Sequence, residues 1–290
     1  KHPVTIDLES GVDGDGRFVF RTARIVADGG AYANSSPVIP KAAGSAVLGP
    51  YRMRVAHVGA LVAYTNQPPA GSFRGLGVSQ AAWAGERQVD EIAAALGIDP
   101  IEFRRRNLVV DGDRLPNGDL VTDAHWLGCL EAALEGDGPT GVDDPPWIRR
   151  GRGCAVVMKA TMAPFSSGVR LGLQPDGTLV VEASAVDMGQ GARSALARMA
   201  AAAMGIAVED VRIVDPDTLI TPFDATTSSS RTVNQHYHAI AEAADRLRAE
   251  LERLARQVGE GGFEPAYRDG RLVDEARGTS LSAGEVVAAA

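Results

Sequence analysis

Three stretches of the sequence combine small or polar residues with the start of a predicted helix. They are Gly71–Gly77, Met188–Gly191 and Thr226–Arg231. The first backbone N–H groups of a helix have no partner inside it and carry the positive end of its dipole, and glycine lets a ligand approach the backbone closely. Gln190 can both donate and accept, and Arg74 offers a fixed fork of donors. Together the stretches predict an extended polar groove for a large ligand with a phosphate and a heterocycle.

A simpler interpretation is that these stretches only cap helices. Ser72 and either Thr227 or Ser228 are residue types that are preferred at helix N-caps. Caps of this kind would use the free N–H groups and leave no site for a ligand. The residues by themselves leave both interpretations open.

No other local motif contains a complete catalytic set. The sequence has no P-loop, no HExxH and no GxSxG. His236 and His238 stand two positions apart on a predicted helix, so their side chains point about 200° apart and are not expected to share a metal. The run Arg104–Arg106 could bind phosphate, but a solvated helix face paired with acidic neighbours is the favoured interpretation. We therefore predict no direct metal ligand.

The elements around these stretches indicate an α+β fold of two lobes, with mixed sheets and packed helices. Leu179, Val181, Ala183 and Ala185 alternate as in a strand, and the alanine-rich run 192–204 is typical of a helix. Both lobes are expected to contain a hairpin whose second strand ends in Asp followed by glycines. This similarity suggests a repeated plan, although it is too short to establish a duplication.

A stretch rich in Gly, Pro and Asp separates the two lobes. We place the domain boundary in it, which gives domains at 1–110 and 151–290 and a linker at 111–150 with a short helix near 124–134. The second domain is expected to begin with a strand at 152–162. A chain of 290 residues is long enough for each lobe to have its own core.

Composition excludes several classes of partner. A net charge of −8 and an aromatic content of 5% argue against binding to nucleic acid. No apolar run approaches the length of a membrane span. Cys129 and Cys154 stand in apolar surroundings and are predicted to be buried free thiols in a reducing compartment, which favours a cytoplasmic protein.

Four segments, in order along the chain, resemble the large subunits of molybdenum hydroxylases, the family of xanthine dehydrogenase and aldehyde oxidase. The first is similar to the arginine-bearing segment of these subunits, the second to a helix that closes their first molybdopterin-binding half, and the last two to cofactor loops of the second half. The segments are AGSFRGLGVSQ (70–80), GIDPIEFRRRNL (97–108), DMGQG (187–191) and TPFDATTSSSR (221–231).

The resemblance implies a molybdenum-bearing molybdopterin, in bacteria usually the cytosine dinucleotide form. Such enzymes hydroxylate a carbon next to nitrogen or oxygen with oxygen from water, and the electrons leave through iron–sulfur clusters and FAD on partner modules. The resemblance therefore implies a cytoplasmic oxidoreductase that acts on an aldehyde or N-heterocycle, a homo-oligomeric complex with no nucleic-acid or membrane partner. The alternative is a non-catalytic cofactor- or nucleotide-binding module.

The resemblance also assigns roles to individual residues. Leu76 would shape the substrate pocket, at a position where purine-oxidising members carry an aromatic residue. Gly71 stands where carbon monoxide dehydrogenases carry a copper-binding cysteine, which disfavours that subclass. The implied cofactor-binding residues are Phe73, Arg74, Gly75, Gly189, Gln190, Gly191, Ser228, Ser229 and Ser230.

The chain is expected to be an internal fragment of such a subunit. The glutamate that serves as the family's general base would follow Ala290, and a glutamine-bearing segment would precede Lys1. We therefore predict no catalytic residue within the chain and no turnover by the chain alone.

Overall fold

A computed structural model describes residues 1–135, 145–159 and 166–290. The chain divides into two compact units, Lys1–Lys159 and Ala160–Ala290. The helices and strands of the first unit are β1 (Val4–Val12), β2 (Phe18–Gly30), η1 (Ser36–Val38), α1 (Ile39–Leu48), β3 (Val55–Tyr64), α2 (Val78–Leu96), α3 (Pro100–Asn107) and α4 (Trp126–Glu135). Those of the second are β4 (Val169–Leu173), β5 (Leu179–Ala183), α5 (Ala192–Met204), η2 (Val208–Asp210), β6 (Val211–Ile213), α6 (Arg231–Val258), β7 (Ala266–Arg268), β8 (Arg271–Asp274), β9 (Thr279–Ser282) and α7 (Ala283–Ala289).

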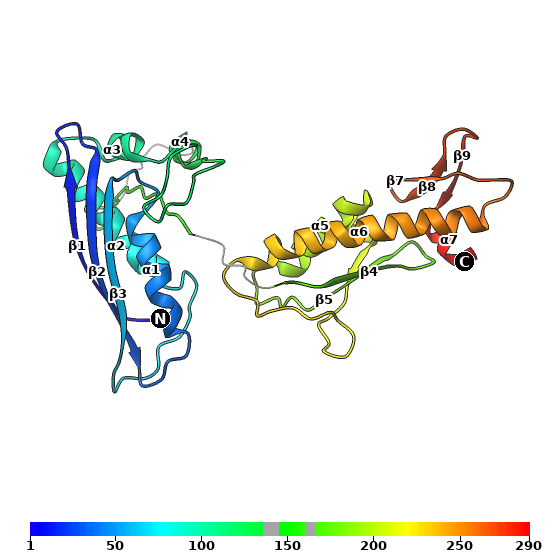
Figure 1. The fold of residues 1–290 in the computed structure, drawn as a ribbon, viewed down its shortest axis with the longest axis horizontal. Coiled ribbons are helices and arrows are strands. Elements are labelled where there is room, and N and C mark those ends of the chain that lie inside the picture. The colour runs from blue at the N-terminus through cyan, green and yellow to red at the C-terminus, as the bar shows by residue number, and fades with distance from the viewer. Residues whose placement is uncertain (136–144, 160–165) are drawn as a thin grey trace. The chain divides into compact units, whose positions relative to one another are not determined.

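The first unit is built on a three-stranded sheet. β1 pairs antiparallel with β2, and β2 pairs parallel with β3. The Asp-Gly turn between β1 and β2 ends at Gly16, whose φ of +74° suits glycine. Helices α1 and α2 cover one face of the sheet (Figure 1), and the apolar side chains on that face, such as Ile25, pack against Ala43 and Val47 of α1.

A second core in the first unit joins α2, α3 and the residues that follow them. Leu130 of α4 and Val156 pack into the same cluster as Phe103. Parts of the stretch expected to be a linker thus belong to the first compact unit. The domain bounds 1–110, 111–150 and 151–290 stay predictions.

The predicted strand at 152–162 is wrong over its described part. Residues 152–159 form neither helix nor strand, and the backbone N–H of Val156 donates to the buried carboxylate of Glu86 instead of to a neighbouring strand. The cysteine prediction is wrong for Cys129, which is exposed; Cys154 is half-buried, and both thiols are free.

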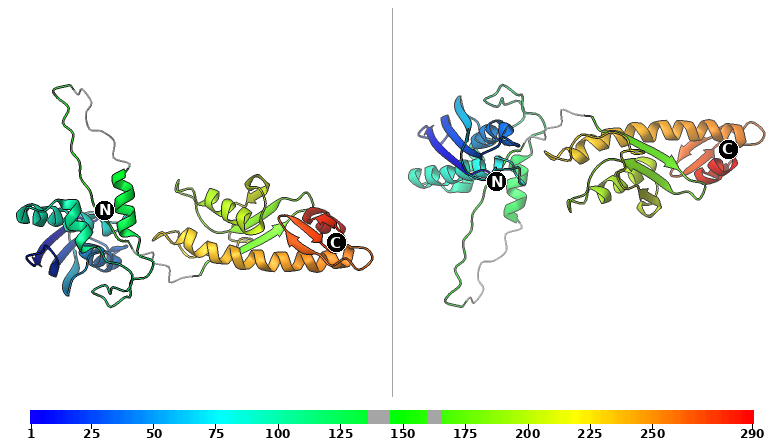
Figure 2. Two further views of the ribbon diagram at one scale, coloured as in Figure 1. Left: turned by 90° about the horizontal axis from the view of Figure 1, so that it is seen from above. Right: turned by 90° about the horizontal axis from the view of Figure 1, so that it is seen from below.

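The second unit repeats the strand pattern of the first. β4 and β5 form an antiparallel hairpin, and β6 pairs parallel with β5. Helix α6 runs along the unit beside α5 and β4, and the small sheet β7–β9 with α7 lies at its C-terminal end (Figure 2). One apolar core joins these elements, and Leu179, Leu196 and Leu251 are among its fully buried side chains.

The predicted α+β class is confirmed. The described residues form mixed helices and three small sheets, and each unit has its own sheet and core. Among the described residues, no helix is both long and apolar enough to cross a membrane.

Candidate functional site

The Met188–Gly191 turn connects β5 to α5 and is exposed along its whole length. Gly189 and Gly191 have φ angles of +95° and +79°, which only glycine adopts without strain. Apart from the adjoining residues, no described atom lies within 4 Å of the point where a Cβ would stand on either glycine. A ligand can therefore approach the backbone of this turn directly.

The N-terminus of α5 already holds an anion of its own chain. The Asp187 carboxylate accepts the backbone N–H of Gly189 at 2.9 Å, that of Gly191 at 3.2 Å and that of Arg193 at 3.2 Å. The N–H of Arg193, followed by those of Gly189 and Gly191, lowers the pKa of the Asp187 carboxyl. The expectation that these N–H groups are free is wrong at this helix.

The side chain of Gln190 is bound within the turn. Its Nε2 donates to the carbonyl of Val186 at 2.8 Å, and its Oε1 accepts the N–H of Met188 at 2.5 Å. The amide keeps one further N–H and one further lone pair for another molecule. Met188 is 70% exposed.

The second loop, 226–231, lies against this turn. The N–H of Val186 donates to Thr227 Oγ1 at 3.3 Å. Ser229 and Ser230 have φ angles of +53° and +62°, a conformation rare for residues with side chains and concentrated at functional sites. Helix α6 begins directly after them at Arg231.

Thr227 and Ser228, the residues predicted to cap this helix, do not cap α6 in the described part of the chain. The Ser228 hydroxyl donates to the carbonyl of Thr226 at 3.3 Å, and Thr227 is the acceptor for Val186. The N-cap residue of α6 is Ser230, whose side chain makes no capping hydrogen bond to the described residues. The cap-only interpretation therefore fails at this junction.

A buried ion pair between Arg231 and Asp224 holds the 226–231 loop. Arg231, 1% exposed, donates to Asp224 Oδ1 at 2.9 Å, to Ser167 Oγ at 2.9 Å and to the carbonyl of Ala225 at 2.7 Å. Ser167 Oγ in turn donates to Asp224 at 2.6 Å. Sequence reasoning assigned no role to Asp224 or Arg231, although an acid and an arginine that flank a Ser/Thr loop are a usable signal.

The third stretch, Gly71–Gly77, belongs to the first unit. Gly75 and Gly77 have φ angles of +87° and +75°, and a Cβ on Gly75 would stand 2.0 Å from Ser79 Oγ. α2 begins at Val78 with Gly77 as its N-cap, so Ser72 does not cap it. The structure thus joins two of the three predicted stretches, Met188–Gly191 and Thr226–Arg231, within one unit.

The side chains of this third stretch face solvent. Phe73 is 66% exposed, Arg74 is exposed and Leu76 is half-buried. Lys1 Nζ lies 5.4 Å from the ring centroid of Phe73 and donates to the carbonyl of Arg74 at 3.3 Å. An exposed aromatic ring beside the Lys1 ammonium, with a second exposed cation next along the chain, is suited to a flat, anionic ligand.

The three arginines at 104–106 differ in their burial. Arg104 is fully buried against Glu86, so the prediction of a solvated face is wrong for it. Arg105 and Arg106 form exposed pairs with Glu131 and Glu102, as that interpretation expected.

The histidines do not form a metal site. His236 is buried and contacts the carbonyl of Thr232, whereas His238 is exposed. Over residues 1–135, 145–159 and 166–290, no group of three or more His, Cys, Asp or Glu side chains is arranged to hold a metal.

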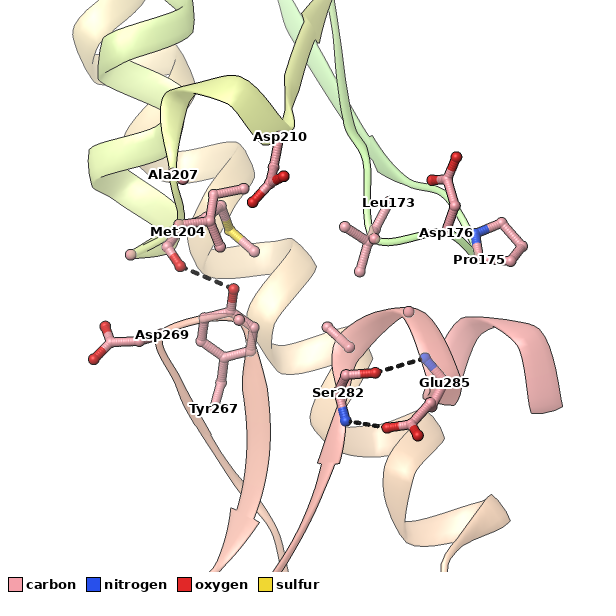
Figure 3. Close-up of a pocket in the computed structure, with 16 residues that line it drawn as sticks. Leu173, Pro175, Asp176, Met204, Ala207, Asp210, Tyr267, Asp269, Ser282 and Glu285 are labelled. Carbon is pink, nitrogen blue, oxygen red and sulfur yellow. Dashed lines mark hydrogen bonds between the residues drawn. The ribbon is translucent and has the colours of Figure 1, made fainter.

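A cavity of about 450 Å³ lies at the other end of the second unit (Figure 3). It is lined by the β4–β5 turn, the end of α5, the β7–β8 turn and the start of α7. Its Tyr267 hydroxyl donates to the carbonyl of Met204 at 2.9 Å, and Ser282 and Glu285 cap α7 reciprocally. These groups hold the elements together. The end of α5 and Tyr267 contact α6 at Arg248 and Glu252, about 30 Å along the helix from the loop at Ser228–Ser230.

Two family matches cover most of the chain. Residues 1–108 and residues 135–290 each match a family described as molybdopterin cofactor-binding domain. The xanthine dehydrogenase molybdenum-binding subunit of Escherichia coli O157:H7 is 32% identical over 262 residues, which are 87% of this chain and 35% of that protein. The nicotinate dehydrogenase large molybdopterin subunit of Eubacterium barkeri is 37% identical over 136 residues, 47% of this chain and 32% of that protein. The chain spans about a third of the length of these relatives.

Solved structures share the fold. Quinoline 2-oxidoreductase from Pseudomonas putida 86 superposes with a TM-score of 0.76 at 22% identity, over 98% of this chain and 39% of that one. The relatives are molybdenum-binding subunits of oxidoreductases, and the four segments that first indicated this likeness lie within the matched ranges.

Proposed function

The chain belongs to the family of molybdopterin cofactor-binding domains, and on that premise we propose that its glycine- and serine-rich loops hold a molybdenum-bearing pterin. The residues proposed to contact it are those implied by the sequence: Phe73, Arg74, Gly75, Gly189, Gln190, Gly191, Ser228, Ser229 and Ser230. The observation that carries the proposal is the hydrogen bond between Val186 and Thr227, which joins two of these loops.

The residues of the second unit fit such a group chemically. A pterin presents a planar edge of alternating donors and acceptors, and the turn offers open backbone at Gly189 and Gly191 with a Gln190 amide beside it. The left-handed conformation of Ser229 and Ser230 turns the loop backbone sharply before α6. These features favour hydrogen bonding along an edge over binding of a metal by side chains.

When bound, the cofactor would supply hydroxylation of a carbon next to nitrogen or oxygen. The chain's own residues would bind and orient it, and electrons would pass to iron–sulfur and FAD modules of the complete complex. We propose the cytosine dinucleotide form of the cofactor and a homo-oligomeric complex. A non-catalytic binding module is the alternative that the experiment below separates.

The general base of the reaction is proposed to lie outside these loops. Asp187 and Asp224, the described carboxylates that flank the two loops of the second unit, are both engaged: the first accepts three backbone N–H groups and the second is buried against Arg231. The lone pairs of both carboxylates are thus occupied by groups of the chain itself, which does not suit either one to serve as a general base. We therefore propose that the 290 residues alone do not turn over a substrate.

The proposed substrate is an aldehyde or an N-heterocycle. Two relatives carry xanthine or nicotinate in their names, and a structural neighbour carries quinoline; all three are N-heterocycles. Leu76, the proposed pocket residue, is aliphatic and half-buried, so it cannot stack on a purine as an aromatic ring would.

The proposal is tested on the complete natural subunit purified from cells that make the cofactor. Molybdenum and the fluorescent oxidised pterin are measured per polypeptide in the wild type and in Gln190→Ala and Ser228→Ala. We expect about one of each in the wild type and a several-fold loss in the variants. Gln174→Ala, which removes an exposed glutamine at the other end of the second unit, should change nothing. A stable wild-type subunit without molybdenum and pterin would contradict the proposal and favour a different binding module.

A further inference from the structure

We infer that Asp187 is the positioning residue of the Met188–Gly191 turn, and that the turn receives a neutral, hydrogen-bonding part of its ligand and not a phosphate. The inference depends on the proposed function only for the identity of the ligand. The place of the carboxylate is a property of this chain by itself.

The geometry places the carboxylate where a bound anion would otherwise sit. Oδ1 accepts from Gly189 and Gly191, and Oδ2 accepts from Arg193, the second residue of α5. Gly191 is the N-cap residue of α5, and as a glycine it has no side chain that could cap the helix. The positive end of the α5 dipole and three N–H donors therefore face a negative charge that the chain supplies.

The arginine in the first turn of α5 is also engaged. The Arg193 guanidinium pairs with Asp215 and donates to the carbonyl of Ile213 at 3.0 Å. A phosphate brought to this turn would meet the Asp187 carboxylate without a free arginine to offset it. The negative charges of the phosphate and of the Asp187 carboxylate would repel each other, so the ligand's phosphate is expected to bind elsewhere.

What remains open on the turn is neutral. The space above Gly189 and Gly191 is clear of described atoms, and the Gln190 amide retains one donor and one acceptor position. Because Asp187 occupies the N–H groups of Gly189 and Gly191, the turn offers its uncharged backbone carbonyls and the Gln190 amide. These groups are complementary to the edge of a heterocycle and not to an oxyanion.

The first arm of the test uses inorganic pyrophosphate and the ¹⁵N-labelled 290-residue chain. Backbone amide signals of Gly189, Gly191 and Arg193 are followed in the wild type, Asp187→Ala, Asp187→Asn and Asp187→Glu. We expect no saturable shifts in the wild type and in Asp187→Glu. Asp187→Ala should show saturable shifts, with an affinity for pyrophosphate at least about tenfold above the upper limit set by the wild type, because the N-terminus of α5 is then open to the anion. Asp187→Asn, which keeps the side-chain shape without the charge, should gain binding too and preserves the test if the alanine variant does not fold.

Asp176→Ala is the matched control. Asp176 also accepts a backbone N–H in a turn, that of Thr178 at 2.9 Å, but at the opposite end of the second unit. Its loss should leave the three amide signals unchanged in pyrophosphate. Saturable wild-type shifts at Gly189, Gly191 and Arg193 would overturn the inference, since the ligand anion would then displace the carboxylate.

The second arm measures pterin content in the complete subunit. Asp187→Ala should lower the pterin per polypeptide several-fold, and Asp187→Glu, which keeps a carboxylate, should retain it. If the turn needed only a folded backbone, the two variants would have the same pterin content. Full pterin content in Asp187→Ala would overturn the positioning role. A subunit without pterin in any variant, combined with the pyrophosphate result above, would remove the proposed function and leave the place of the carboxylate intact.

Discussion

Arg104 in the first unit and Arg231 in the second are two of the three fully buried arginines among the described residues, and each is paired with a carboxylate. Arg104 is bonded to Glu86 at 2.9 Å and to Asp90 at 2.7 Å, and Glu86 also accepts from Tyr51 at 2.6 Å and from the N–H of Val156 at 2.8 Å. Burial, and then the Glu86 carboxylate, raises the pKa of Tyr51, so its hydroxyl remains a donor. This network ties α2, α3 and the 153–157 stretch into one core.

Arg231 makes a similar pair with Asp224, but its guanidinium also donates to backbone carbonyls of the 226–231 loop and the residue before it. It contacts the carbonyls of Ala225 and Thr226, directly before the serines of the proposed cofactor loop. Arg231 Nε and His236 Nε2 are buried and have no hydrogen-bond partner among the described residues, whereas every polar side-chain atom of Glu86 and Arg104 that is buried has one. His236 Nδ1 faces the carbonyl of Thr232, and Nε2 lies 3.6 Å from Asp224 Oδ2, beyond hydrogen-bond distance. Buried polar atoms without a hydrogen bond cost about 1–3 kcal/mol each, and such costs collect at functional sites.

The difference teaches that the first network serves the fold and the second serves a loop. Breaking the first should therefore change stability alone. Breaking the second should change stability and cofactor retention together, which is the distinction that the variants below are chosen to expose.

Glu86→Ala is expected to have the largest effect. It leaves Arg104 buried beside only one carboxylate and removes the acceptor of Tyr51 and Val156, so the free energy of unfolding should fall by about 3–5 kcal/mol in urea titrations. Glu91→Ala, which removes an exposed pair with Arg87 on the same helix, should cost under about 1 kcal/mol. Equal losses in the two variants would show that the Glu86 network does not support the core.

Arg231→Ala comes next. Asp224 would remain buried without its cation, and unfolding should become easier by about 3 kcal/mol. In the complete subunit the variant should also lose pterin at temperatures where it is still folded by circular dichroism. Arg246→Ala on the same helix, an exposed pair with Glu242, should change neither quantity. If the folded Arg231→Ala subunit kept its pterin, the two networks would not differ in role.

Thr227→Val should have a smaller effect on stability, about 1 kcal/mol, because it removes one hydrogen bond to the partly exposed Val186 N–H. Its effect on pterin retention should be larger than its effect on unfolding, since the bond fixes the two loops to each other. Thr218→Val, in an exposed segment of the same unit, serves as the control. A change in unfolding free energy without a change in pterin retention would mean that the link is only structural.

The smallest effect is a titration. The pKa of Asp187 is lowered, so its contribution to stability is present above the ordinary aspartate value of 3.8 and is lost as the pH falls through the lowered folded value. The ¹³C signal of its carboxyl should therefore titrate below 3.8, and the amide signals of Gly189 and Gly191 should move with it. A midpoint at or above 3.8 would mean that the carboxylate is not held by the turn.

The sequence predicted the local elements well and their supporting contacts poorly. The alternation of Leu179–Ala185, the glycines around Gln190 and the alanine-rich run 192–204 depend on nearest neighbours, and each produced the expected strand, turn or helix. Asp187 was visible beside the turn, but only its distance to the N–H of Arg193 reveals that it fills the helix end. The site residues themselves stay predictions.

Long-range burial explains the other failures. The sequence predicts Arg104 to be a surface residue because Arg105 and Arg106 beside it are also charged. In the structure its guanidinium donates to Glu86, which is 18 positions away. Val156 looks like part of a strand because its segment is apolar, but its partner is a carboxylate 70 positions away. Spacing along the chain carries no information on such pairs.

The most direct measurement is an experimental structure of the complete subunit purified with its cofactor. The account predicts density for the pterin within hydrogen-bond distance of the Gly189–Gly191 backbone or the Gln190 amide, beside Ser228–Ser230, with the Asp187 carboxylate still on the N–H groups of Gly189, Gly191 and Arg193. Pterin density at the cavity lined by Tyr267 and Glu285, or a phosphate in place of the Asp187 carboxylate, would contradict it.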